Sequence, residues 1–305
     1  MNNAAPSGRI LITGGSGFLG RAFIAAMGAE GREVISIGRS PAPGARHAPA
    51  DLADPASLRA ALASLRNEPA PDAIVHLAVS RHHRDFPAKA LDLFHVNAST
   101  AAELLDFGCA RGVRQVVFGS TGTVYGAGVT SPEKASLRAS EDTFQRPSSY
   151  FAASKLFADT MAELYRGYMS VAVLRFYAPY GPGLRNRMLA DLVERVREGR
   201  PLSLPSSGGG LTFSAIHIDD AVAVLRAALD LGWRDTVNVA SPEVWSIESA
   251  GHLIGRLVGT EAKFERDSNT LALRLVPAVD LLQTLMPGRD WIRLEDGLAG
   301  MIAGL

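Results

Sequence analysis

Short apolar runs alternate with Ala- and Leu-rich stretches over the first part of the chain. The runs richest in Val and Ile lie at residues 10–13, 34–37, 73–77, 115–118 and 171–176. Such runs are typical of strands that are buried on both faces, and the stretches between them have the apolar spacing of helices. The pattern therefore predicts an α/β fold built on a doubly wound parallel sheet. Ligands of such sheets bind at the carboxyl ends of the strands, and we expect the functional residues there.

A glycine-rich segment, TGGSGFLG at residues 13–20, directly follows the first predicted strand. A first glycine permits a tight turn, a second lets the backbone approach a phosphate, and a third lets the following helix pack against the strand. A glycine triplet alone also fits an ordinary strand-turn-helix connection, but a helix predicted over 21–27 and a strand over 33–37 complete a dinucleotide-binding unit. The pyrophosphate would lie at the helix N-terminus. The residues expected to contact the cofactor here are Gly14, Ser16, Gly17, Phe18, Leu19 and Gly20.

The regular alternation of predicted strands and helices ends after residue 178. A Pro/Gly turn at 181–183, a charged helix predicted over 188–198 and a glycine run at 208–210 are followed by a return of the core pattern at 216–231 and a strand at 237–239. We therefore expect two interleaved regions rather than two consecutive ones. Residues 1–178 and 212–240 would form the dinucleotide-binding domain, and residues 179–211 and 241–305 a smaller C-terminal substrate-binding region.

Composition narrows the classes of partner. Lys and Arg number 31, as do Asp and Glu, so the formal net charge is zero and no basic stripe predicts a nucleic-acid or membrane-surface partner. No apolar run has the length of a membrane span and the N-terminus lacks the apolar core of a signal peptide, so a cytoplasmic location is expected. The single Cys109 excludes an intrachain disulfide and is expected to be packed in a helix. His82 and His83 have no partner at metal-ligand spacing, so we expect a solvated loop pair and no metal site.

Ordered motifs along nearly the whole chain carry a resemblance to a known family. After TGGSGFLG come Asp51-Leu52-Ala53-Asp54, His76-Leu77-Ala78, Asn97, GSTGTVYG at 119–126, SSYFAASK at 148–155, LRFYAPYGPG at 174–183 and His217-Ile218-Asp219-Asp220. The chain resembles the extended short-chain dehydrogenase/reductase family, also called the NAD-dependent epimerase/dehydratase family. The resemblance implies a Rossmann fold, a nicotinamide cofactor, and a homodimer formed by helices near 90–110 and 150–168. It implies further cofactor contacts at Asp51, Leu52, Leu77, Ala78 and Asn97.

The resemblance also implies catalytic positions. Thr121 matches the family hydroxyl that binds the reacting oxygen, although such a hydroxyl also caps turns. Lys155 matches the family lysine, which binds the nicotinamide ribose and lowers the pKa of a catalytic tyrosine; otherwise it would lie on a solvated helix face. The tyrosine position, four residues before that lysine, holds Phe151, which has no ionisable hydroxyl. Tyr150 precedes it, but a spacing of five turns its side chain by roughly 140° from the direction of Lys155 unless the helix bulges or unwinds.

Three explanations of Phe151 remain open. The first is a deliberate Tyr→Phe substitution that removes one hydroxyl and keeps the ring. The second is a natural loss of redox chemistry, which would leave a binding or sensing protein. The third is catalysis through Tyr150 or through a group of the substrate. We favour the first because every other element of the site is intact.

The residues that end the second predicted strand indicate whether the cofactor is NAD or NADP. NAD-preferring members carry an acidic residue at its end for the adenosine ribose, and this chain has Gly38 there, followed by Arg39 and Ser40. Without the acid, a 2′-phosphate meets no repulsion, and Arg39 can pair with it. This predicts NADP rather than NAD, although NAD stays open because Arg39 also fits a solvated loop charge.

The substrate positions depart from the pattern of nucleotide-sugar members. Ala178 and Phe213 stand where many members have an Asn and a diphosphate-binding Arg. Candidate substrate-binding residues are Tyr177, Arg185 and Arg187, with Tyr180 and Arg175 as weaker ones. The leading hypothesis is an NADP(H)-dependent epimerase, dehydratase or ketoreductase that acts on a nucleotide-activated sugar or a similar polyhydroxylated small molecule. The alternative is a catalytically silent NADP-binding regulatory or scaffold protein.

Overall fold

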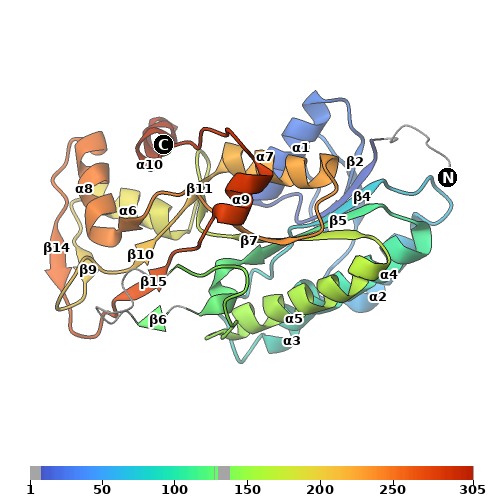
Figure 1. Cartoon of the computed structure of the whole chain (residues 1–305), viewed down its shortest axis with the longest axis horizontal. Helices are drawn as coiled ribbons and strands as arrows, with labels where there is room; N and C mark the ends of the chain where they lie inside the picture. The colour runs from blue at the N-terminus through green and yellow to red at the C-terminus, as the bar shows by residue number, and fades with distance from the viewer. Residues whose placement is uncertain (1–7, 127, 130–137, 305) are drawn as a thin grey trace. The chain divides into compact units, whose positions relative to one another are not determined.

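The computed structural model describes residues 8–126, 128–129 and 138–304 (Figure 1). The chain forms two compact units that interleave along the sequence. The first consists of Met1–Val124, Pro147–Arg175 and Val222–Val237, and the second of Tyr125–Arg146, Phe176–Ala221 and Asn238–Leu305. Segments 125–146 and 212–221, with residues 176–178 and 238–240, thus belong to the second unit, whereas the sequence assigned them to the first. Their backbone hydrogen bonds explain the difference, because both segments supply short strands to the small sheets of the second unit.

A seven-stranded parallel sheet forms the centre of the first unit. It contains β1 (Ile10–Thr13), β2 (Val34–Gly38), β3 (Arg46–Pro49), β4 (Ala73–His76), β5 (Gln115–Thr121), β7 (Ser170–Phe176) and β12 (Thr236–Val239). Their order is β12-β7-β5-β4-β1-β2-β3, so the direction of winding reverses between β1 and β4. This confirms the predicted doubly wound sheet, in which the switch point is the expected place of a bound ligand. The sequence analysis did not predict β3 as a strand. Only one of its four residues is buried, so its sequence contains no apolar run.

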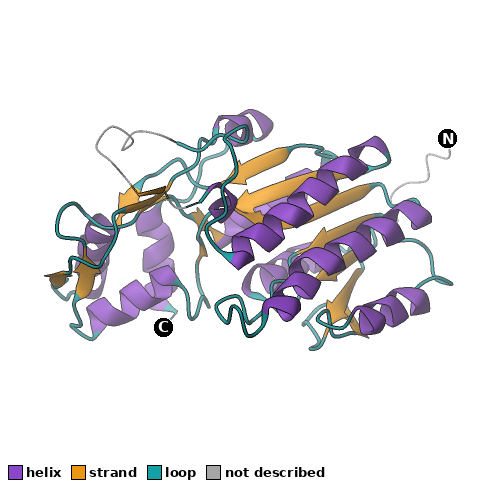
Figure 2. Cartoon of the chain, turned by 90° about the horizontal axis from the view of Figure 1, so that it is seen from below, coloured by secondary structure: helices purple, strands orange, loops and turns teal. Residues whose placement is uncertain are grey.

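Helices cover both faces of this sheet (Figures 1 and 2). The helix α1 (Phe18–Ala29) lies on one face with α7 (Ile218–Asp230), and α2 (Pro55–Ser64), α4 (Thr100–Arg111) and α5 (Tyr150–Leu164) lie on the other. Leu104 and Leu105 of α4 pack with Val116 and Phe118 of β5 in the main apolar core. Asn97 lies before α4 in a π-helical turn (His95–Ser99) that follows α3 (Ala90–Phe94). Cys109 is exposed on α4, so the expectation of a packed thiol was wrong.

The second unit combines small sheets with helices. A four-stranded sheet has the order β13 (Trp245–Ser246), β10 (Thr212–Phe213), β15 (Leu273–Leu275) and β6 (Gly128–Val129). Two parallel pairs join β8 (Pro179–Tyr180) to β11 (Ile216–His217) and β9 (Leu202–Leu204) to β14 (Phe264–Arg266). The helix α8 (Ile247–Val258) contacts α6 (Met188–Arg197) and α10 (Leu294–Ala303), and α9 (Asp280–Leu285) follows β15. Among the described residues, no helix combines the length and apolar character needed to cross a membrane.

Candidate cofactor and active site

The glycine loop after β1 has the shape of a phosphate cradle. Gly14 has φ +78°, and a Cβ added there would lie 2.5 Å from the backbone nitrogen of Ala78. A Cβ at Gly20 would lie 2.2 Å from the carbonyl oxygen of Gly14, so this helix turn can approach the loop only without side chains. Gly17 is the N-cap of α1 and supplies no side-chain cap, which leaves the first amides of the helix open to an anion. These residues fit the pyrophosphate of a dinucleotide.

The end of β2 offers open space and a positive charge. A Cβ added at Gly38 would meet no atom within 4 Å, and Arg39 and Ser40 are both exposed. Asp51 lies in a loop that follows β3, where its carboxylate accepts the backbone N–H of Ala53 at 3.0 Å. The carboxylate of Asp51 therefore stabilises its own loop. At residue 38, where NAD-preferring members carry a ribose-binding acid, the glycine leaves the space without a side chain. This arrangement admits the larger 2′-phosphate as well as a free hydroxyl.

The end of β4 forms the floor beside the cradle. The N–H of Leu77 donates to the carbonyl of Thr13 at 3.0 Å, and the hydroxyl of Thr13 hydrogen-bonds Nδ1 of His76 at 2.7 Å. Burial, reinforced by the charge of Lys155, holds the pKa of His76 well below its usual value. His76 is therefore a neutral structural residue at physiological pH, and it keeps the strand end and the cradle in register.

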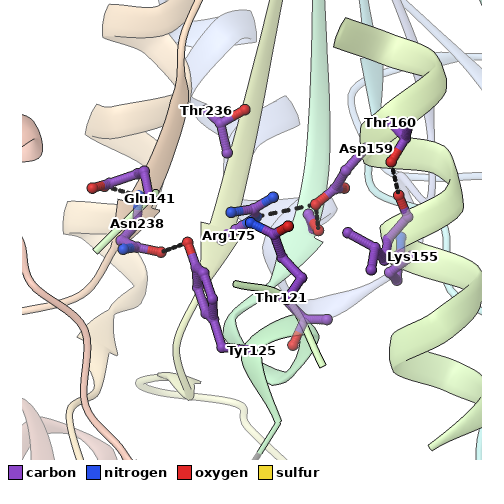
Figure 3. A network of polar contacts seen from close by, with 12 residues as sticks. Thr121, Tyr125, Glu141, Lys155, Asp159, Thr160, Arg175, Thr236 and Asn238 are labelled. Carbon is purple, nitrogen blue, oxygen red and sulfur yellow. Dashed lines mark hydrogen bonds and ion pairs between the residues drawn. The ribbon is translucent and has the colours of Figure 1, made fainter. Parts of the chain in front are cut away.

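Lys155 is a buried cation on α5 (Figure 3). It is 2% exposed on α5, and its Nζ donates to the carbonyl oxygens of Gly119 at 2.9 Å and Ala78 at 3.3 Å. Burial lowers the pKa of Lys155 to about 8, against the opposing effect of Asp159. Lys155 therefore does not lie on a solvated face of the helix, which was the other interpretation of the sequence. The ammonium group is tied to the carboxyl ends of β4 and β5, which is the edge where ligands of a doubly wound sheet bind.

Asp159 is a buried residue that the sequence analysis missed. It lies one helical turn beyond Lys155, accepts a hydrogen bond from Ser120 at 2.9 Å, and pairs with Arg175 at 3.1 Å (Figure 3). Burial raises the pKa of Asp159 to about 6, although Arg175 opposes the shift. The charged Arg175 within the apolar strand β7 was the available signal, since a buried guanidinium needs an acid. Because it is paired with Asp159, Arg175 is a structural cation rather than a substrate ligand.

The first turn of α5 carries the residues around the missing tyrosine. Ser149 is its N-cap, and its hydroxyl accepts the N–H of Ala152 at 3.2 Å. The helix is regular from Tyr150 onward, so Phe151 and Lys155 lie one turn apart on one face and Tyr150 keeps its offset of roughly 140°. The ring of Tyr150 stacks on Phe86 with centroids 5.0 Å apart.

His82 and His83, in the loop after β4, were expected to be a solvated pair, and the structure differs from this expectation. Nδ1 of His82 lies 2.7 Å from Oδ2 of Asp85, and His83 is half-buried with its ring edge against Phe151, at a centroid distance of 6.1 Å and an angle of 62°. The expectation of a solvated pair was therefore wrong for His83. The reason is tertiary, because the loop folds over the N-terminus of α5. No cluster of three or more metal-ligating side chains occurs among the described residues.

Thr121 and Asn97 are placed by backbone and side-chain hydrogen bonds. Thr121 ends β5, and its hydroxyl accepts the N–H of Thr123 at 3.2 Å, which is the turn-capping contact that the sequence allowed. Asn97 is fully buried; its Nδ2 donates to the hydroxyl of Ser154 at 2.9 Å, and its Oδ1 accepts the N–H of Ser80 at 3.3 Å. Asn97 thus joins the loop after β4 to α5. Leu52, another predicted cofactor residue, is buried, and its carbonyl oxygen accepts from Thr100 at 3.4 Å. Of the predicted cradle residues, Ser16 is exposed in the loop, and Phe18 and Leu19 are partly exposed at the start of α1.

The substrate candidates of the second unit fall into two groups. Tyr177 and Tyr180 are buried, and the Tyr180 ring lies edge-on to His217 at 5.3 Å. Arg185 and Arg187 are exposed and flank Asn186, which has a positive φ of 55°. Ala178, at the position where many nucleotide-sugar members have an Asn, also has a positive φ, of 37°.

A further cation of the second unit, Arg274, was not found by sequence reasoning. Burial, together with the nearby charge of Arg138, lowers the pKa of Arg274. It lies on β15, paired in register with Thr212 of β10. No local pattern marks this residue, because only the strand pairing brings residue 274 beside the strand of Phe213.

Comparison with known proteins decides the family. The model of the NAD-dependent epimerase/dehydratase family matches residues 10–240. The chain belongs to this family. It is 27% identical over 283 residues to a dTDP-4-dehydro-6-deoxy-D-allose reductase of a Streptomyces species, covering 85% of this chain and 83% of that protein.

Solved structures of the family agree with the fold. The structure of MoeE5 in complex with UDP-glucuronic acid and NAD matches with a TM-score of 0.82 and 25% identity, over 97% of this chain and 98% of that one. The UDP-glucose 4-epimerase of Thermus thermophilus in complex with NAD matches with a TM-score of 0.82 and 23% identity, over the same shares of the two chains. The relatives of this family member thus include a reductase and an epimerase of sugar nucleotides, and NAD is bound in a neighbouring structure.

Proposed function

We propose that this protein is an NADP(H)-dependent epimerase, dehydratase or ketoreductase of a nucleotide-activated sugar, located in the cytoplasm. The observation that carries the proposal is the buried ammonium group of Lys155, which is held at the carboxyl ends of β4 and β5. Relatives that reduce or epimerise dTDP- and UDP-linked sugars support the substrate class. The order of the motifs and the glycine cradle support the cofactor class.

Each part of the site has a role in this proposal. Backbone amides of the first turn of α1, which follows the Gly17 N-cap, bind the pyrophosphate. Lys155 binds the nicotinamide ribose, and Thr121 orients the reacting oxygen of the sugar. When bound, the dinucleotide supplies or accepts a hydride. Residue 151 is where a tyrosine hydroxyl would exchange the proton, and Phe151 leaves this part of the chemistry impaired.

The preference for NADP rests on Gly38, Arg39 and Ser40. The end of β2 carries no acid that would repel a phosphate, and the space at Gly38 is open. An exposed guanidinium and a hydroxyl in this place can bind a 2′-phosphate.

A homodimer is also proposed. Apolar side chains on α3, α5 and the turn after α5 are exposed: Leu91, Phe157, Leu164 and Tyr168. Since α3 and α5 contact each other, these exposed side chains support an interface on this pair of helices. Light scattering that shows a monomer at micromolar concentration would contradict it.

The test compares the chain with its Phe151→Tyr variant. Both are incubated with NADP(H) or NAD(H) and with UDP- and dTDP-linked sugars and their 4-keto forms, and the products are followed by NMR. We expect Phe151→Tyr to raise turnover strongly on one of these substrates. A variant that binds NADP(H) and leaves every nucleotide sugar unchanged would contradict the proposal.

The absence of a hydroxyl at Phe151 favours a second candidate function. A protein that binds NADP(H) and acts only as a regulator or scaffold would retain the cradle and Lys155 without catalysis. It predicts tight cofactor binding in both forms and no turnover even by Phe151→Tyr. The same experiment therefore separates the two functions.

A further inference from the structure

The start of the loop from Ser80 to Phe86 is tied to α5 by a chain of polar contacts. Ser80 donates its N–H to Asn97 Oδ1 at 3.3 Å, and Asn97 Nδ2 donates to Ser154, next to Lys155. The hydroxyl of Ser80 accepts the N–H of His82 at 3.0 Å, and also donates to Asp92. The start of the loop is thus fixed to the helix that carries residues 151 and 155.

Within this loop, the two histidines have different environments. The ring of His82 is bound to Asp85 at 2.7 Å, and the backbone N–H of Asp85 donates to the carbonyl of His82 at 2.9 Å. These bonds turn the loop so that His83 meets Phe151, with ring centroids 6.1 Å apart. An imidazole therefore lies beside residue 151, whose phenyl ring carries no group that could exchange a proton. Imidazole is the side chain best suited to exchange protons near neutral pH.

We propose that His83 is the proton donor and acceptor of this chain, in place of the hydroxyl that residue 151 lacks. The inference rests on the proposed function and adds to it the residue that carries the residual activity. In the reducing direction, the ketone carbon of the sugar receives the hydride from the reduced cofactor, while the carbonyl oxygen receives a proton from the His83 imidazolium. The C=O group becomes H–C–O–H, the imidazole is left neutral, and it regains its proton from water.

The test is a double-mutant cycle between residues 83 and 151. With Phe151 present, we expect His83→Gln to lower kcat on the 4-keto nucleotide sugar by about 100-fold or more, with little change in KM. In the Phe151→Tyr background, we expect the same substitution to change kcat by less than about threefold, because the hydroxyl replaces the imidazole. Free imidazole should restore part of the activity of His83→Ala. The matched control is His252→Gln, which removes another histidine ring packed against a phenylalanine, Phe264 at 4.8 Å, and should leave kcat unchanged.

Two results would overturn the inference while leaving the proposed function intact. One is an equal loss on His83→Gln in both backgrounds without imidazole rescue, which would indicate a packing role. The other is turnover by Phe151→Tyr while the chain with Phe151 is no more active than its His83→Gln variant. If no variant turns over any nucleotide sugar although NADP(H) binds, the proposed function itself fails, and the role of His83 fails with it.

Discussion

Asp159 and Arg175 form an ion pair that is removed from water. Nε of Arg175 lies 3.1 Å from Oδ2 of Asp159, and the two side chains are only 3% and 2% exposed. Ser120 donates a further hydrogen bond to the same carboxylate oxygen. This pair joins α5 to β7 directly beside Lys155, so it holds the helix that carries the candidate catalytic positions.

Replacing one member of this pair is expected to destabilise the protein strongly. Asp159→Asn leaves the guanidinium of Arg175 buried without a counter-charge, which should lower the free energy of unfolding by about 3–5 kcal/mol. The matched control is Asp191→Asn, which breaks the exposed pair of Asp191 and Arg195 at 3.0 Å and should change stability by less than about 1 kcal/mol. Urea unfolding measures both, and similar losses for the two variants would contradict the importance of burial.

The pKa of Lys155 predicts a pH dependence of stability. Burial lowers this pKa to about 8 from the ordinary 10.5, so between these values the unfolded chain binds a proton that the folded chain has lost. Stability rises with pH wherever the unfolded state binds more protons. The free energy of unfolding of the chain, relative to Lys155→Met, should therefore increase as pH rises from about 8 toward 10.5 and stay level below 8. Unfolding curves of the two proteins across this range test it, and a difference that falls with pH would refute the assigned direction.

Two glycines of α1 form a matched pair for testing the cradle. Gly20→Ala puts a Cβ 2.2 Å from the carbonyl oxygen of Gly14, so the loop must shift and the cofactor affinity should fall by about 100-fold or more. At Gly28 a Cβ meets no atom within 4 Å, and Gly28→Ala should leave binding unchanged and stabilise the helix by up to about 1 kcal/mol. Calorimetric titration with NADP(H) and thermal unfolding report the two effects separately. Equal affinities for both variants would show that the cradle does not bind the pyrophosphate.

The sheet could be predicted because its central strands are buried on both faces. Each of β1, β2 and β4 is therefore a short run of mostly apolar residues that can be recognised in the sequence. The edge strand β3 could not be predicted in this way, because three of its four residues are at least partly exposed. The pattern of apolar residues thus predicts strands that are buried on both faces. It misses an edge strand that forms because a neighbouring strand pairs with it.

The candidate site divides in a similar way. The glycines at 14 and 20 leave a local trace in the sequence, because a tight turn and a close helix–strand approach require them, and Lys155 was singled out by the family motif that it matches. The contact of His83 with Phe151 and the pairing of Asp159 with Arg175 depend on side chains 68 and 16 residues apart in the sequence. No spacing rule connects such residues, so only the folded chain shows that they meet.

The proposed NADP preference predicts a switch by one substitution. Gly38→Asp places a carboxylate in the open space at the end of β2, where it would repel a 2′-phosphate and accept hydrogen bonds from free ribose hydroxyls. We expect the Kd for NADP to rise by about tenfold or more and the Kd for NAD to fall. Arg39→Gln should weaken NADP alone, because the guanidinium pairs only with the phosphate. If Gly38→Asp weakens both cofactors equally, the substitution disturbs the loop and the assignment of the 2′ position is wrong.

The backbone conformation of Ala178 suits the Asn that many nucleotide-sugar members have at this position. Its φ of 37° lies in the left-handed region, where a Cβ is strained and where Asn is better tolerated than Ala. Ala178→Asn should therefore raise the free energy of unfolding by about 0.5–1 kcal/mol. On the exposed face of α2, Ala60→Asn should instead lower it by about 0.5 kcal/mol, because Asn is the poorer helix former. Opposite signs in urea unfolding would show that backbone geometry alone favours Asn at residue 178. The same sign at both positions would mean that its neighbours select Ala there.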